Sequence, residues 1–254
     1  MNFKFMLLAV AAATVFNSCK KDNKVVADTP VGTVSFKFAN FVGENPLELN
    51  STGYQYANEN GDSFNVTNYK YYVSNVRFLK SDGTEYLCPE SYFLIDHANT
   101  ATFNKLVERV PAGTYTSMKV LLGVDSTRNV SGAQTGDLDP MHGMFWTWAS
   151  GYIMAKTEGN FKGSGGVNTG YSFHLGGFYK FSVLRDISLT LPQSLVVSDK
   201  SAATINMKSD VLKWFAAPNL IKFQELNQVG AIGEDAANIA DNYKASMTVT
   251  SIEN

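Results

Sequence analysis

Alternating hydrophobic and polar positions dominate this chain and predict a protein built mainly of strands. The pattern is clearest over residues 34–42, where every second side chain is apolar except for Asn40 and would share one face of an extended segment. Residues 69–79 and 85–87 flank a short turn at 81–83, which is typical of a β-hairpin. Further strands are expected at residues 92–95, 114–124, 151–158, 171–175, 187–191 and 203–207.

Helical periodicity is scarce along the chain. One turn is expected at residues 211–215, before Pro218, and a longer helix at 234–247. Many short strands separated by turns imply an all-β fold, and we expect one antiparallel β-sandwich or barrel-like domain with long loops. The longest interval without a strand pattern is 125–145, and a loop of this length inside a compact domain is usually functional.

The start of the chain differs from the rest and predicts export. A lysine is followed by an apolar stretch over residues 5–16, shorter than the roughly 20 residues that span a bilayer, and Cys19 comes soon after. This arrangement is typical of a bacterial lipoprotein, with a signal peptide over residues 1–18 and lipid on Cys19. We expect residues 19–31 to be a flexible tether and 32–254 to be the folded domain.

Composition narrows the classes of partner and of site. A formal net charge of −2 argues against nucleic-acid binding, which needs a basic face. If Cys19 carries lipid, the second cysteine, Cys88, is left alone, which excludes a disulfide framework and a multi-cysteine metal site. The lipid predicts attachment to the outer membrane in the cell envelope, facing the periplasm or the cell surface, and the membrane is then a partner of the chain.

Side chains suited to a soft metal gather between residues 139 and 154. Two of the 3 tryptophans, one of the 3 histidines and three of the 8 methionines lie there, and His174 follows within Phe-His-Leu-Gly-Gly. Imidazole and thioether groups suit copper, and thioether suits Cu(I) in particular. The chain shows neither the carboxylate spacing of a calcium loop nor a cysteine pair for zinc.

Each of these residues also has a plain structural interpretation. Trp146 and Trp148 alternate, so they would share one face of a strand, where large aromatic side chains pack well in a core. His142 fits an ordinary loop residue, and His174 fits a strand histidine bonded to a backbone carbonyl. If residues 159–170 form a loop between neighbouring strands, His174 would lie across from Trp146 or Trp148.

Several short motifs, taken together, resemble the MbnP-like copper-binding proteins, relatives of CorA and MopE. The resemblance runs through most of the chain after Cys19, and the stretch from Gly143 to Trp148 is its most specific part. The motifs are Tyr71-Tyr72-Val73-Ser74-Asn75-Val76, Pro111-Ala112-Gly113-Thr114-Tyr115, Gly123-Val124-Asp125-Ser126, Gly136-Asp137-Leu138-Asp139-Pro140, Gly143-Met144-Phe145-Trp146-Thr147-Trp148-Ala149-Ser150-Gly151-Tyr152, Phe173-His174-Leu175-Gly176-Gly177 and Ala240-Asp241-Asn242.

The resemblance implies a particular copper chemistry. In characterised relatives, histidines bind copper together with a tryptophan oxidised to kynurenine, whose aromatic amine can donate to the metal where an indole N–H cannot. A di-haem, peroxidase-like enzyme performs that oxidation in one relative, which implies such a partner here. Carried over to this chain, the resemblance makes His174 the leading ligand and Trp146 or Trp148 the modified residue, with Trp146 favoured. His142 is a weaker ligand candidate. Met144 is either a soft ligand or a core residue.

A lipid-anchored copper-binding protein, not an enzyme, is therefore the function we expect. The chain has no Gly-x-Ser-x-Gly elbow, no His-Glu-x-x-His motif and no phosphate-binding glycine loop. The third histidine, His97, is expected at a strand end. The alternative is a surface binding or adhesion module without metal, because exposed aromatic rings can stack on sugars or peptides.

Overall fold

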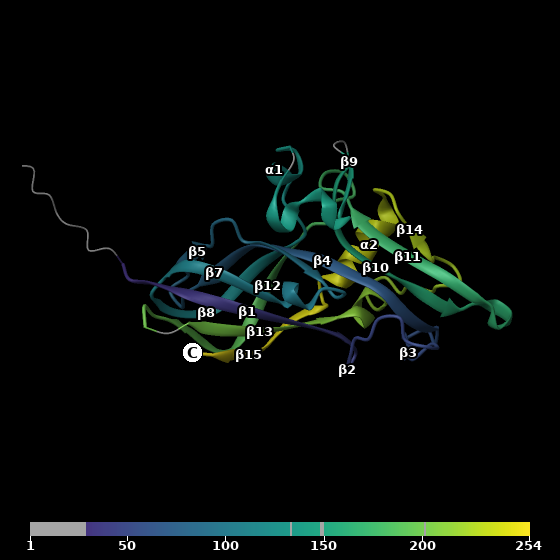
Figure 1. Cartoon of the computed structure of the whole chain (residues 1–254), viewed down its shortest axis with the longest axis horizontal. Helices are drawn as coiled ribbons and strands as arrows, with labels where there is room; N and C mark the ends of the chain where they lie inside the picture. The colour runs from purple at the N-terminus through teal and green to yellow at the C-terminus, as the bar shows by residue number, and fades with distance from the viewer. Residues whose placement is uncertain (1–28, 133, 148–149, 201) are drawn as a thin grey trace, which may run out of the picture.

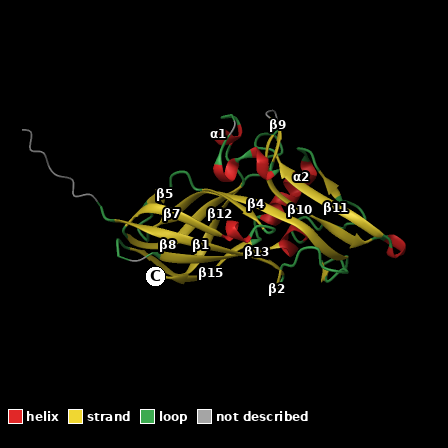
Figure 2. Cartoon of the chain, in the orientation of Figure 1, coloured by secondary structure: helices red, strands yellow, loops and turns green. Residues whose placement is uncertain are grey.

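The computed structural model describes residues 29–254 apart from 133, 148–149 and 201 (Figure 1). Residues 1–18, Cys19, most of the expected tether and Trp148 therefore lie outside the described residues. Strands account for most of the described chain, and helices are few and short (Figure 2). The all-β fold expected from the alternation is confirmed. No helix within the described residues is long and apolar enough to cross a bilayer.

The smaller of the two sheets is built around the first strand of the domain. Its order is β15-β13-β1-β2, with β7 also paired to β1. The strands are β1 (Val31–Val42), β2 (Asn45–Pro46), β7 (Asn104–Pro111), β13 (Ala203–Asp210) and β15 (Met247–Glu253). β1 and β13 run parallel, so the sheet is not purely antiparallel. A parallel pair needs a long crossover, which the intervening strands of the other sheet supply.

The larger sheet carries the residues of interest for function. Its main path is β12-β8-β4-β10-β11-β14, with four short strands attached to β4 and β10. The path strands are β4 (Ser63–Leu79), β8 (Gly113–Leu122), β10 (Gly151–Lys162), β11 (Asn168–Gly176), β12 (Arg185–Val197) and β14 (Gln228–Val229). The attached strands are β3 (Tyr56–Ala57), β5 (Glu85–Leu87), β6 (Tyr92–Asp96) and β9 (Phe145–Thr147).

The helical segments match the expectations in part. The turn expected at 211–215 is the 3-10 helix η5 (Val211–Phe215), and the late helix begins at the expected residue but ends early, as α2 (Glu234–Tyr243). A turn from Tyr243 to Ser246 then leads into β15, because Met247 pairs with Ser209 of β13. The remaining segments are η1 (Thr100–Phe103), α1 (Ser126–Asn129), η2 (Gly136–Leu138), η3 (Pro140–His142) and η4 (Ser164–Gly166).

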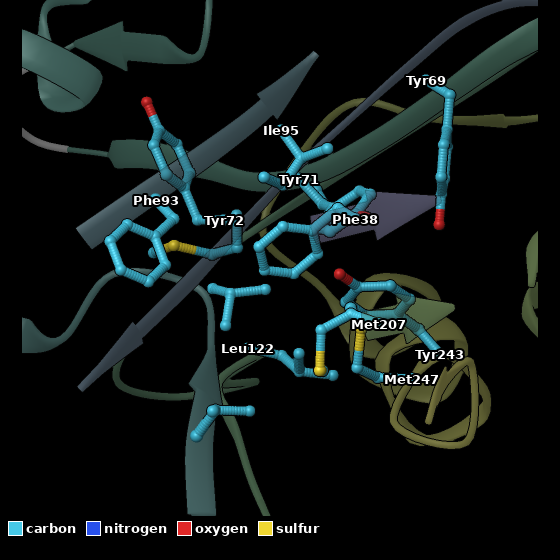
Figure 3. Packing of buried hydrophobic residues seen from close by; sticks show 14 of the residues in the cluster. Phe38, Tyr69, Tyr71, Tyr72, Phe93, Ile95, Leu122, Met207, Tyr243 and Met247 are labelled. Atoms are coloured by element: carbon cyan, nitrogen blue, oxygen red, sulfur yellow. The ribbon is translucent and has the colours of Figure 1, made fainter. Parts of the chain in front are cut away.

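The core lies between the two sheets and is unusually rich in aromatic rings. The face expected for residues 34–42 is confirmed, since Val34, Phe36 and Phe38 are at most 4% exposed and Asn40 is buried beside them. Figure 3 shows Phe38 close to Tyr71 of β4, with Tyr243 of α2 approaching from the other side. Rings of this size supply most of the apolar area that such a core removes from water.

One buried polar network links the two sheets across this core. Tyr71 donates its hydroxyl hydrogen to Oδ1 of Asn40 at 2.8 Å, and Nδ2 of Asn40 lies 2.9 Å from Nδ1 of His97. His97 directly follows β6, so its expected place at a strand end is confirmed. Because Nδ2 of Asn40 can only donate, Nδ1 of His97 has to accept, which requires a neutral imidazole.

We expect this network to make folding stability depend on pH. Burial lowers the pKa of His97 below its ordinary 6.5. The unfolded chain therefore takes up a proton first as the pH falls through about 6.5, and the free energy of unfolding decreases over that window. Above it, the contribution is fully present. Urea unfolding at about pH 7.5 and about pH 5 measures the difference.

The matched variants are His97→Gln and His142→Gln, both measured without metal. The first should flatten the pH dependence in the window below about 6.5, and the second, at an exposed loop position, should not change it. An unchanged slope in His97→Gln would show that other titratable groups, not the His97 network, control stability in this range.

Candidate functional site

The β10–β11 hairpin places His174 in the larger sheet, but not in the way the sequence pattern suggested. The ladder runs from Ile153 opposite Gly176 to Lys162 opposite Asn168, so the loop expected over residues 159–170 is wrong. Both strands continue because their alternate side chains, such as Phe161 and Tyr171, are buried in the core. His174 consequently pairs with Lys156 and not with a tryptophan.

The face of β11 that turns away from the core carries the polar residues. Tyr171, Phe173 and Leu175 are buried, while Ser172 and His174 alternate with them and are partly exposed. Gly176 is the next position on the outward face after His174. Along the neighbouring strand, Lys156 and Glu158 lie opposite His174 and Ser172. This outward face of β10 and β11 is called the His174 face below.

Trp146 covers the end of the His174 face. It lies in β9, which pairs with the beginning of β10 through Thr147 and Gly151. Its indole rests on Gly176, because a Cβ atom added to that glycine would lie 2.2 Å from Cζ3 of Trp146. Positions two apart along a strand are about 7 Å apart, so Trp146 and His174 occupy successive places on one face. His174 therefore does not lie directly across from Trp146, as the sequence pattern suggested; the two are neighbours only through Gly176.

The His174 imidazole is held by a carboxylate. Its Nε2 lies 2.6 Å from Oε1 of Glu158, and Oγ of Ser172 is 3.2 Å from the same nitrogen. Asn68 of β4 donates to the other carboxylate oxygen of Glu158 at 3.1 Å. The hydrogen bond from His174 is the main reason that the pKa of Glu158 falls to about 2. The sequence also allowed a hydrogen bond from His174 to a backbone carbonyl; in the structure the partner is the Glu158 side chain.

Two lysines connect the loop expected to be functional to the sheet beneath it. Nζ of Lys156 donates to the carbonyl of Gly143 at 3.0 Å, and Nζ of Lys70 reaches the carbonyl of His142 at 3.4 Å. Lys70 also pairs with Asp96 at 2.8 Å. Burial lowers the pKa of Lys156 from its ordinary value. These cations of β4 and β10 hold the segment that leads into Trp146 against the sheet.

The other expected ligands lie in different surroundings. His142 is exposed at the end of η3, with Nε2 2.9 Å from the carbonyl oxygen of Gly136. Its carbonyl oxygen lies 3.4 Å from Nζ of Lys70 on β4, and β10 separates β4 from β11 in the sheet. Met144 is 1% exposed and packs in the core, so its thioether would have to leave the core to reach a metal. Trp148 lies outside the described residues.

The donor set at the His174 face can be compared with what copper needs. Within the described residues, no group of three or more histidine, cysteine, aspartate or glutamate side chains is arranged to hold a metal ion. A partly exposed imidazole next to a tryptophan suits a softer site, in which an oxidised tryptophan would add an aromatic amine. The His174 face therefore supplies one imidazole and one tryptophan of the donor set that the resemblance implies, and among the described residues it carries no second histidine.

Sequence reasoning missed Glu158, Lys156 and Gly176. Glu158 and Lys156 belong to an ordinary strand, and only the register of the hairpin puts them opposite Ser172 and His174. Gly176 did carry a signal, because a glycine inside a strand often marks a close approach by another group.

Comparison with known proteins gives the family. The family model MbnP matches residues 31–232, which is most of the described chain. Among solved structures, MbnP from Methylosinus trichosporium is similar, with a TM-score of 0.48 and 14% sequence identity over 81% of this chain and 83% of that one. No curated protein sequence matches. On the match of the family model, the chain belongs to the MbnP family, which is associated with copper binding.

Proposed function

We propose that this protein binds copper outside the cytoplasm as a lipid-anchored, non-enzymatic protein of the cell envelope. Membership of the MbnP family supports copper binding, and the pattern of residues 1–19 supports export and a lipid on Cys19. The protein would serve the acquisition or handling of copper in a compartment where a membrane tether keeps it close to the cell.

One observation supports the site more than any other. The Trp146 indole rests on Gly176, the outward position next to His174. Of the expected ligands within the described residues, His174 of β11 and Trp146 of β9 are the pair that Gly176 brings together. We propose His174 and the oxidised form of Trp146 as donors, with His142 as a further donor if the η3 segment moves toward β11. Met144 is then a core residue.

The proposed modification converts the Trp146 indole to kynurenine. Opening the ring adds two oxygen atoms, and hydrolysis by one water then releases the formyl group as formate, which leaves a net gain of one oxygen and a net loss of one carbon. The two oxygen atoms would come from two equivalents of hydrogen peroxide, each reduced to water, acting through a di-haem, peroxidase-like partner. Trp146 is only partly buried, so such a partner has access to its ring.

The test is metal analysis and peptide mass spectrometry of the protein purified from its native host. We expect copper to copurify, and the peptide that contains Trp146 to show the change of mass from tryptophan to kynurenine. Trp214 is an internal control, since it is 0% exposed in the core and should remain unmodified. Native protein with intact Trp146 and Trp148 and a copper affinity weaker than about 1 μM would refute the proposal.

A further inference from the structure

We propose that Glu158 is a positioning residue for copper binding. Its carboxylate accepts a hydrogen bond from Nε2–H of His174, which leaves Nδ1 of His174 to bind the metal. The inference rests on the proposed function, since it concerns the same face. It adds what the resemblance did not contain: the donor atom of the histidine and the residue that selects it.

The hydrogen-bond partners of His174 determine which ring nitrogen carries the proton. A carboxylate only accepts, so the 2.6 Å contact with Oε1 of Glu158 requires a hydrogen on Nε2. A neutral imidazole carries one N–H, so its lone pair is then on Nδ1. Nδ1 of His174 has no hydrogen-bond partner among the described residues. The nitrogen that could bind a metal is therefore the one nearer the strand.

The carboxylate is itself held in place, which makes its effect on His174 directional. Asn68 of β4 donates to Oε2 of Glu158 at 3.1 Å and leaves Oε1 for the imidazole. Three neighbouring strands, β4, β10 and β11, thus contribute one side chain each to a chain from Asn68 through Glu158 to His174. Metal-binding histidines commonly donate their other N–H to a carboxylate, which orients the ring and raises its basicity.

His142 shows the same protonation pattern by a different route. Its Nε2 lies 2.9 Å from the carbonyl oxygen of Gly136, and a carbonyl oxygen can only accept. Nε2 of His142 therefore also carries the hydrogen, and Nδ1 carries the lone pair. The two histidine candidates would thus both present Nδ1 to a metal.

The first test reads the tautomer of His174 by NMR in metal-free protein labelled at histidine. At about pH 8, the ring nitrogen shifts distinguish the Nε2–H tautomer from the Nδ1–H tautomer. With 3 histidines in the chain, a His174→Ala spectrum assigns the signal. We expect Nε2–H in the wild type and in Glu158→Gln, whose amide oxygen can still accept, and a mixture of both tautomers in Glu158→Ala.

The second test measures copper affinity of the same variants in protein from the native host. Removing a residue that hydrogen-bonds to a metal ligand and orients it lowers metal affinity by roughly 10- to 100-fold. We expect a decrease of this size in the copper affinity of Glu158→Ala and a smaller decrease in that of Glu158→Gln. Glu85→Ala is the matched control. Its side chain is 36% exposed, compared with 31% for that of Glu158. Glu85 lies in β5 and pairs with Lys119 of β8, outside the β10–β11 hairpin. Its copper affinity should equal that of the wild type.

The outcomes separate this inference from the proposed function. Wild-type affinity in Glu158→Ala together with loss of binding in His174→Ala would overturn the role of Glu158 and leave the copper function standing. If the wild type fails to bind copper, the proposed function fails, while the metal-free tautomer still reports on Glu158. An Nδ1–H tautomer in the wild type would overturn the assignment of the donor atom.

Discussion

Replacing Gly176 with alanine is expected to push the Trp146 indole off the His174 face. The new methyl group would lie 2.2 Å from Cζ3 of Trp146, well inside van der Waals contact, so the ring has to move. Overpacking of this kind costs about 1–3 kcal/mol of stability. Because the displaced ring no longer neighbours His174, we also expect copper affinity to fall by roughly 10- to 100-fold. Urea unfolding and a copper titration measure the two effects.

Gly170→Ala is the matched control on the same strand. A Cβ atom there would meet only the carbonyl oxygen of Gly159, at 3.9 Å, which is ordinary contact. Neither glycine has the left-handed backbone that alanine avoids, so the two substitutions differ in burial and in what the new methyl group meets, not in backbone strain. Equal stability and equal copper affinity in the two variants would show that the packing of Trp146 on Gly176 has no part in the site.

The second large effect is expected for His174→Ala. Removing the leading ligand should lower copper affinity by about 100-fold or more, a greater loss than removal of a residue that only orients a ligand. The fold should persist, because the pair with Glu158 is partly exposed and such pairs contribute little to stability. Titration of copper into both forms, followed by circular dichroism to verify folding, gives the comparison.

His142→Ala tests the weaker ligand candidate in parallel. Its backbone lies over β4 and its side chain is exposed, so we expect a smaller loss of copper affinity than in His174→Ala. The reverse order, with the larger loss in His142→Ala, would move the centre of the site from the β10–β11 hairpin to the η3 segment.

Local pattern was enough to predict most strands of this protein. The alternation over residues 34–42 reflects a strand with one buried face, and that face is the one observed. The hairpin at 79–85 was likewise predictable, since its turn residues and its flanking strands lie within one short segment. The family could also be recognised from motifs, and the match over residues 31–232 agrees.

Other features depend on partners that are distant in the chain. Residues 104–111 and 247–253 carry weak strand patterns of their own and become β7 and β15 by pairing with β1 and β13. The same pairing ends α2 four residues before the expected boundary, because Met247 is needed opposite Ser209. The parallel pairing of β1 with β13 has no local signal at all.

The candidate site divides in the same way. The sequence by itself determined which side chains could bind a soft metal, because imidazole, thioether and indole chemistry belong to the residue types, and it brought His174 and Trp146 forward as a pair. Only the tertiary structure decided their setting: the register of β10 and β11 puts Glu158 within hydrogen-bond reach of His174, and the absence of a side chain at Gly176 admits the indole. Register and close approach are properties of two segments together, so neither segment alone could reveal them.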